Sequence, residues 1–134
     1  MYFLDTNICV YFLKGIYEEV RYKIQNTSPK EIKIPSIVKA ELLYGAEKST
    51  RRKQNIEKIN YFLDPFEIIC FDDKSSIEYA FLRADLEKKG SVIGPNDFII
   101  ASIVKSNNGT LVTNNVKEFK RIKNLRIENW VNQA

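Results

Sequence analysis

The stretch Tyr2-Phe3-Leu4-Asp5-Thr6-Asn7 decides how the rest of the chain is organised. Its three apolar residues predict a short strand, and the polar residues that follow can cap a helix. The apolar spacing of residues 8–13 predicts that helix. Asp5 is therefore expected where the strand ends and the helix begins.

The remainder of the chain repeats this alternation. Further strands are predicted over residues 32–34, 66–71, 110–113 and 125–127. Further helices are predicted over residues 18–24, 51–63, 77–89 and 98–104, one more opens at residues 35–36, and a short segment covers residues 116–122. Strands that alternate with helices indicate an α/β fold with a mainly parallel central sheet of four to five strands, flanked by helices. A length of 134 residues fits a single domain over residues 1–134.

The composition excludes several kinds of active site. The chain has no histidine, which rules out Ser-His-Asp triads and Cys-His nucleophiles and removes the commonest zinc ligand. Cys9 and Cys70 lie in apolar stretches far apart in the sequence, so we expect two buried, reduced thiols. The net charge of +4 mildly favours an acidic partner such as nucleic acid.

The apolar runs of the chain are short. None approaches the roughly 20 residues that a membrane-spanning helix needs, and an acid, Asp5, lies close to the N-terminus, where a signal peptide has basic residues. We therefore expect a cytoplasmic protein with no membrane partner.

Acidic residues occur at the predicted ends of strands and starts of helices. The functional crevice of an open parallel sheet lies at the carboxyl ends of its strands, where Asp5 and Asn114-Asn115 are expected. Asp97, at a helix start, and Glu41, in an apolar helix, can face the same crevice. Several carboxylates in one pocket repel one another, and Mg²⁺ or Mn²⁺ relieves that repulsion.

Each of these charged residues also has a purely structural interpretation. A single Asp at a helix start is a routine cap, and Asp72-Asp73, before Ser75-Ser76, fits capping better than a metal site. Lys48 with residues 51–53 indicates a solvated helix start. A second basic set is either solvated or lines a path for a phosphate backbone. It consists of Lys117, Lys120, Arg121, Lys123 and Arg126.

Short motifs occur in order along nearly the whole chain. They are Leu4-Asp5-Thr6-Asn7, Ala40-Glu41-Leu42 with Tyr44-Gly45, Asn96-Asp97 followed by Ile99 and Ala101, Leu111-Val112-Thr113-Asn114-Asn115 with Glu118-Phe119, and Ile127-Glu128-Asn129-Trp130. Together they resemble a PIN-domain ribonuclease, and within that family the VapC toxins of bacterial toxin-antitoxin pairs. The resemblance implies a metal-dependent endoribonuclease that cleaves RNA phosphodiester bonds and inhibits translation and growth.

The same resemblance implies roles for individual residues. Asp5, Glu41 and Asp97 become the acids that bind Mg²⁺ or Mn²⁺. Asn115 stands where many PIN domains carry a fourth Asp. A helical turn from Asn115 to Glu118 would place both side chains toward the crevice, where Glu118 holds a metal-bound water; otherwise Glu118 is an exposed helix acid.

Two partners and one alternative function complete the interpretation. The resemblance implies a homodimer and a separately encoded, VapB-like antitoxin that occupies the active-site groove. The alternative is a catalytically weakened PIN-like module that binds RNA or protein, with the Asn at position 115 as the first step of decay. Retention of Asp5, Glu41 and Asp97 argues for the enzyme. A phosphoaspartyl phosphatase, which needs a second Asp at position 7, and a receiver domain, which needs paired acids at its start, fit worse.

Overall fold

The computed structural model describes residues 1–131 and contains one sheet of parallel strands. Within those residues five strands run in the order β3-β2-β1-β4-β5. They are β1 (Tyr2–Leu4), β2 (Ile32–Pro35), β3 (Glu67–Ile69), β4 (Thr110–Val112) and β5 (Arg126–Glu128). Every paired neighbour is parallel, so the predicted α/β class and sheet are confirmed.

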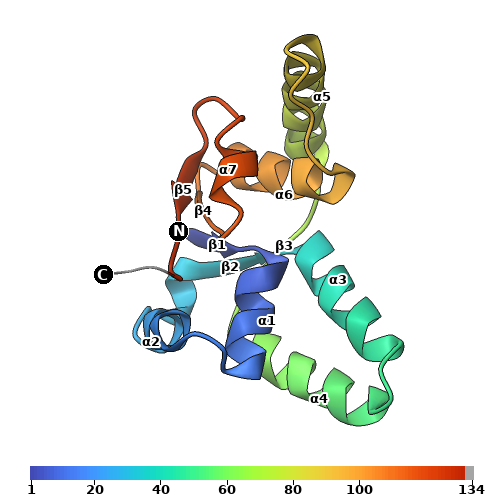
Figure 1. Ribbon diagram of the computed structural model, residues 1–134, viewed down its shortest axis with the longest axis vertical. Coiled ribbons are helices and arrows are strands. Elements are labelled where there is room, and N and C mark those ends of the chain that lie inside the picture. Colours follow the sequence, from blue (N-terminus) through green and yellow to red (C-terminus); the bar gives the residue numbers. More distant parts are fainter. Residues whose placement is uncertain (132–134) are drawn as a thin grey trace.

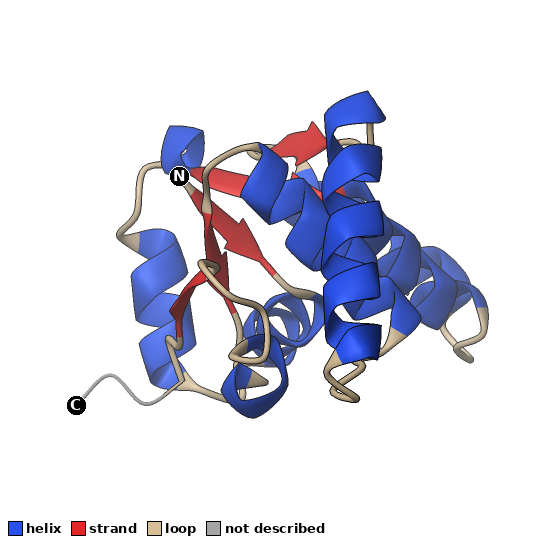
Figure 2. Cartoon of the chain, turned by 90° about the horizontal axis from the view of Figure 1, so that it is seen from above, coloured by secondary structure: helices blue, strands red, loops and turns tan. Residues whose placement is uncertain are grey.

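The helices lie on both faces of this sheet. They are α1 (Thr6–Lys14), α2 (Glu18–Gln25), α3 (Ser36–Glu47), α4 (Arg52–Leu63), α5 (Asp73–Lys88), α6 (Pro95–Ser106) and α7 (Val116–Phe119), with a short 3₁₀ turn at Pro29–Glu31. Figure 1 shows α1 to α4 below the sheet and α5 to α7 above it, and Figure 2 shows the helices packed around the strands from a second direction. Right-handed crossovers in opposite directions from β1 account for this division.

Most predicted elements are present, with shifted boundaries. Helix α5 begins at Asp73 because Oδ1 of Asp72 accepts a hydrogen bond of 3.0 Å from the backbone N–H of Ser75. This confirms the capping role of Asp72. Helix α6 begins earlier than expected, at Pro95, whose fixed φ suits the first turn of a helix. Within the short segment at residues 116–122, helix α7 covers Val116–Phe119.

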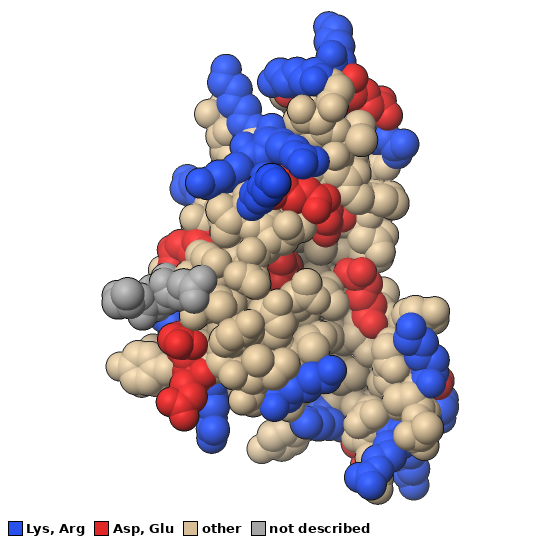
Figure 3. All heavy atoms as spheres, in the orientation of Figure 1, with Lys and Arg blue, Asp and Glu red and all other residues tan. Residues whose placement is uncertain are grey.

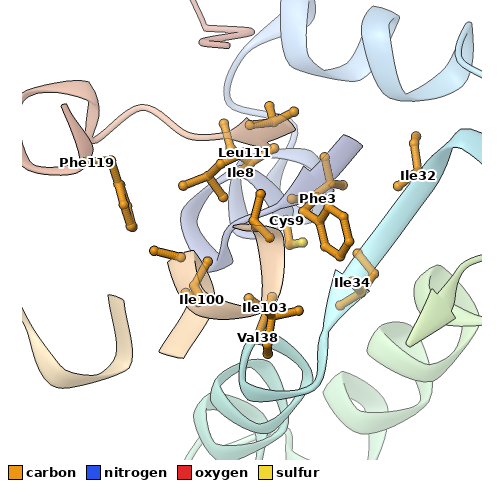
Figure 4. Packing of buried hydrophobic residues seen from close by; sticks show 14 of the residues in the cluster. Phe3, Ile8, Cys9, Ile32, Ile34, Val38, Ile100, Ile103, Leu111 and Phe119 are labelled. Carbon is orange, nitrogen blue, oxygen red and sulfur yellow. The ribbon is translucent and has the colours of Figure 1, made fainter. Parts of the chain in front are cut away.

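The apolar core fills the space between the sheet and its two helix layers (Figure 4). Phe3 on β1 and Leu111 on β4 are fully buried neighbours, and Ile103 of α6 packs in the same cluster. Full burial of one such side chain stabilises the fold by about 1.5–3 kcal/mol. Cys9 is buried in this core, as predicted, but the prediction for Cys70 was wrong: it is exposed, because it follows the strand at the edge of the sheet.

The order of the strands reverses its direction next to β1. From β1 the chain proceeds to β2 and β3 on one side, and it later returns to form β4 and β5 on the other. Leu4 pairs with Val112, so the residues that follow, Asp5 and Thr113, come out side by side at the carboxyl ends of β1 and β4. Such a reversal point is where open α/β sheets place their ligand sites.

Candidate active site

Asp5 is held at the junction of β1 and α1. Its backbone N–H donates to the carbonyl of Val112 at 3.1 Å, which continues the ladder between β1 and β4. Its Oδ1 accepts from the N–H of Ile8 at 3.0 Å as the cap of α1, and its Oδ2 accepts from the hydroxyl of Thr113. Burial raises the pKa of Asp5 to about 6, although these hydrogen bonds favour its ionised form.

Glu41 connects two helix starts. Its Oε1 accepts a hydrogen bond of 2.6 Å from the hydroxyl of Thr6 in the first turn of α1. Its Oε2 accepts one of 3.2 Å from Nδ2 of Asn96 in the first turn of α6. Glu41 therefore faces the crevice from α3, between the helices that carry Asp5 and Asp97.

Asp97 and Glu118 form a hydrogen-bonded pair of carboxyl groups on the other side of the crevice. Burial, followed by the charge of Glu118, raises the pKa of Asp97 to about 7. The pKa of Glu118 is lowered, chiefly by the hydrogen bond that Nδ2 of Asn115 donates to its Oε2 at 2.8 Å. Gly94 donates its N–H to Oε1 of Glu118 at 2.9 Å. Asp97 is consequently the member of the pair that binds a proton more readily.

The structure brings together all the acids that the sequence singled out for the site. The charges of Asp5 and Glu41 both contribute to the raised pKa of Asp97, and Glu41 contributes to that of Asp5. Asn115 and Glu118 are hydrogen-bonded to each other through the turn of α7, as the helical spacing suggested. Figure 3 shows acidic atoms across the middle of one face of the molecule.

Three polar residues of this site were missed from the sequence. Thr113 and Thr6 supply hydroxyl donors to Asp5 and Glu41, and Asn96 supplies an amide donor to Glu41. The available signal was position: each directly follows a strand or directly adjoins one of the acids. Short polar side chains at such positions are otherwise interpreted as helix caps.

The donor set suits a hard divalent cation. The side chains around the crevice offer carboxylate, amide and hydroxyl oxygens, which are the ligands of Mg²⁺ and Mn²⁺. Within residues 1–131, no three Asp, Glu, Cys or His side chains are already close enough to enclose one ion. Mg²⁺ typically keeps several waters and takes only one or two carboxylates, so the arrangement fits a hydrated ion.

A cavity of about 370 Å³ begins beside Glu41 and runs between α1, α3 and α4. Thr6 and Glu41 line it at the end near the acids, and most of the remaining wall is apolar. That wall includes Val10, Leu13, Leu42, Ala46 and Ile59. A mostly apolar recess thus begins beside Glu41, one of the acids of the site.

The two basic sets differ in their surroundings. Arg52 of the first set is paired with Glu47, which agrees with the solvated interpretation. The second set, from Lys117 to Arg126, is exposed, and Arg121 donates to the carbonyl of Val92 at 2.9 Å. In Figure 3 basic side chains gather over α7, next to the acidic atoms of the same face.

The model of the PIN-domain family matches residues 2–125. The chain belongs to the PIN-domain family. Among curated proteins, this PIN domain is 48% identical over 134 residues to "Ribonuclease VapC2" of Rickettsia felis, covering 97% of this chain and 98% of that protein. It is 37% identical over 129 residues to "tRNA(fMet)-specific endonuclease VapC" of Salmonella typhimurium, covering 96% of this chain and 97% of that protein.

Solved structures give the same relationship. This PIN domain superposes with a TM-score of 0.90 on a chain of VapBC2 from Rickettsia felis bound to a DNA fragment of its promoter, at 48% identity over 96% of this chain and 98% of that chain. A chain of the DNA-bound VapBC of Salmonella typhimurium gives a TM-score of 0.91 at 36% identity, over 96% of this chain and 97% of that chain. The predicted resemblance to VapC proteins is therefore confirmed. Among the helices described in residues 1–131, none has the length and apolar character to cross a bilayer.

Proposed function

We propose that this PIN domain is a VapC-type endoribonuclease, the toxin of a toxin-antitoxin pair, which uses Mg²⁺ or Mn²⁺ to hydrolyse RNA phosphodiester bonds. One observation carries the proposal: Asp5, Glu41, Asp97 and Glu118 converge at the reversal point of the sheet, and the pKa values of Asp5 and Asp97 are raised to about 6 and about 7. Acidic residues whose pKa values are raised by burial and by one another's charge are typical of functional sites. The ribonuclease names of the relatives support the same activity and not the weakened binding module.

In this proposal Asp5, Glu41 and Asp97 hold the ion. When bound, Mg²⁺ or Mn²⁺ lowers the pKa of water and offsets the charge that develops on the phosphate. Asp5 is fixed by Thr113 and Ile8, and Glu41 by Thr6 and Asn96, so the oxygens of both are oriented before any ligand arrives. That preorganisation limits the reorientation needed on binding.

Asp97 and Glu118 take part in two different proton transfers, one before the metal ion binds and one during hydrolysis. Because its pKa is raised to about 7, Asp97 has to lose a proton from the partly protonated carboxyl group near neutral pH before its oxygens bind a cation. Glu118 stays ionised, with Oε1 and Oε2 fixed by Gly94 and Asn115. Its remaining lone pairs orient the attacking water and accept its proton as the new P–O bond forms. The P–O bond to the leaving ribose oxygen breaks, and solvent water supplies the proton to that oxygen. Because the chain has no histidine, no imidazole is available for this step.

The test is cleavage of labelled RNA by the purified protein with Mg²⁺, with EDTA, and by variants. Initiator tRNA is the first substrate, because the Salmonella relative is named as specific for tRNA(fMet). We expect EDTA to abolish cleavage, and Asp5→Asn or Asp97→Asn to lower it by orders of magnitude in folded protein. The matched control is Asp72→Asn, which retains the cap of α5 and lies outside the site. Cleavage by the folded Asp97→Asn protein at the wild-type rate would overturn the assignment.

A VapB-like antitoxin is the proposed protein partner, since the solved relatives are VapBC complexes. The apolar recess that begins at Glu41 offers a place for one of its segments beside the acids. Co-expression of the two proteins tests this: Gly45→Glu, which places a charge in the wall of the recess where an added Cβ has no heavy atom within 4 Å, should weaken co-purification. Leu125→Glu, a substitution outside the recess, is the comparison.

We also propose that residues 1–134 form a single domain, of which residues 132–134 lie outside the described part. The protein acts in the cytoplasm, where its RNA substrate is, and two copies of the domain form a homodimer. Ile77 and Phe81, one turn apart on α5, are 73% and 67% exposed. Exposed apolar pairs of this kind mark protein interfaces. Light scattering should give a dimer for the wild type and a monomer for Phe81→Glu.

A further inference from the structure

Tyr44 belongs to a sequence motif that the proposed chemistry does not use. It lies on α3 three residues after Glu41, and residues three or four apart are neighbours on a helix surface. Leu42 and Ala46 turn toward the core, whereas Tyr44 is 65% exposed. An aromatic ring therefore stands in solvent one helical turn from an acid of the crevice.

Lys48 accompanies this ring. It follows Tyr44 by four residues, and its Nζ lies 4.8 Å from the centroid of the Tyr44 ring. A cation over an aromatic face is attracted by the electron density of the ring. Lys48 makes no salt bridge with any acid of residues 1–131, so its charge remains available to a ligand. Together the two side chains present a flat apolar surface and a positive charge.

An exposed aromatic ring beside a cation is the usual recognition unit for single-stranded nucleic acid. Unpaired bases stack on aromatic side chains, and Lys or Arg contacts the adjoining phosphates. We propose that Tyr44 and Lys48 form a subsite for the RNA nucleotide next to the cleaved bond, with the base on Tyr44 and a phosphate at Lys48. This subsite rests on the proposed ribonuclease function, and it holds the RNA strand in register with the acids whatever the base.

Two other tyrosines provide an internal comparison. Tyr22 on α2 and Tyr61 on α4 are 67% and 86% exposed. Within the described part of the chain, neither has a cation over its ring, and neither lies on an element that carries one of the four acids. Exposure alone is thus shared by the three residues, and position and charge distinguish Tyr44.

The experiment measures binding and cleavage separately. Binding of a fluorescent single-stranded RNA of mixed sequence is followed by anisotropy in EDTA, and KM and kcat are measured with Mg²⁺. We expect Tyr44→Ala to raise Kd about tenfold and to raise KM more than it lowers kcat. Tyr44→Phe keeps the ring and stays within about twofold of wild type. Tyr22→Ala and Tyr61→Ala leave both assays unchanged. Lys48→Ala reduces the salt dependence of binding, whereas Lys30→Ala does not.

Other outcomes overturn the inference in distinguishable ways. Wild-type binding by Tyr44→Ala removes Tyr44 from the substrate path. If the same variant loses only its affinity for the antitoxin, Tyr44 is a protein contact. Equal losses in Tyr44→Ala and Tyr44→Phe assign the effect to the hydroxyl and exclude stacking. A wild-type protein that neither binds nor cuts RNA refutes the ribonuclease proposal itself, and this subsite with it.

Discussion

The hydroxyl of Thr113 donates a hydrogen bond to Oδ2 of Asp5, across 108 positions of sequence. The hydroxyl oxygen of Thr113 in turn accepts a hydrogen bond of 2.9 Å from the backbone N–H of Asn115. Asp5 and Thr113 are both buried, so this contact fastens the end of β1 to the end of β4 beneath the crevice. A buried carboxylate oxygen that lacks its donor loses the compensation for its desolvation.

Thr113→Val removes this donor at nearly constant volume. We expect the free energy of unfolding at pH 8 to fall by about 1–3 kcal/mol, and the pKa of Asp5 to rise further, because the lost hydrogen bond favours the ionised form. Urea denaturation measures the free energy of unfolding, and Mg²⁺ titration measures how the higher pKa of Asp5 lowers the affinity for the ion. Thr113→Ser retains the hydroxyl and serves as the control. Identical results for the two variants would contradict the role of the hydroxyl.

The stability of the metal-free protein should depend on the protonation of Asp97. Its folded pKa of about 7 lies above the ordinary 3.8, so the folded state binds more protons between these values, and stability falls as the pH rises from about 4 to about 7. Asp97→Asn can still donate to Glu118 and has no charge to desolvate. It should therefore be more stable than wild type at pH 8 by about 1 kcal/mol, allowing for solvent screening, and by less at pH 5. Thermal unfolding in EDTA checks both values, and equal differences at the two pH values would refute the explanation.

Divalent cations should stabilise the fold. Mg²⁺ that binds only the native state adds about 2.7 kcal/mol at a hundredfold excess over its dissociation constant. The gain should be smaller at pH 6 than at pH 8, because Asp5 and Asp97 have to be ionised in order to bind. Asp97→Asn should gain less than wild type, and Asp72→Asn as much. Equal gains in wild type and Asp97→Asn would place the ion elsewhere.

Glu118→Gln should lower cleavage sharply while leaving most of the stabilisation by Mg²⁺, because Asp5, Glu41 and Asp97 remain. The new amide also faces the donors of Gly94 and Asn115, which now bond the carboxylate. Adding Asn115→Asp reverses that pair, so an amide at 118 donates to a carboxylate at 115 and part of the rate returns. Asn115→Asp alone places a second carboxylate against that of Glu118, and the repulsion between the two lowers the cleavage rate. An unchanged rate in Glu118→Gln would leave catalysis to the other three acids.

Two glycines offer opposite effects on stability. A Cβ at Gly109 would overlap the ring of Phe3, so Gly109→Ala should destabilise the fold by about 1–3 kcal/mol. Gly45 lies in the interior of α3 with no heavy atom within 4 Å of an added Cβ, so Gly45→Ala should stabilise by about 0.5–1 kcal/mol. Denaturation of both variants in urea measures the contrast, and a destabilised Gly45→Ala would contradict it.

The strands and helices could be predicted because their signals are local. The apolar run at Tyr2–Leu4, the cap at Asp72 and the helical spacing after Val116 each occupy a few neighbouring residues. The outcome for Cys70 shows the limit of such signals: an apolar neighbourhood is equally compatible with a central strand and with an edge strand, and only the strand order separates them.

The supporting residues of the site could not be derived in this way. The role of Thr113 requires that β4 pair with β1, and that of Asn96 requires that α6 approach α3. Neither pairing leaves a pattern in the nearby sequence. The acids Asp5, Glu41 and Asp97 were accessible because each lies in a motif that resembles the PIN family and carries a charge that can bind a metal ion, whereas a threonine after a strand gives no such signal.

The central place of β1 in the sheet has a consequence for biosynthesis. Strand β1 is synthesised before β4, at Thr110–Val112, so its second edge stays uncovered until β4 has been made. Until then a nascent chain carries Asp5, Glu41 and Asp97 without the strand and turn that position Asp5 and Glu118. A fragment that ends before Thr110 lacks this strand and the following turn, so we expect it to bind Mg²⁺ weakly and to show no nuclease activity.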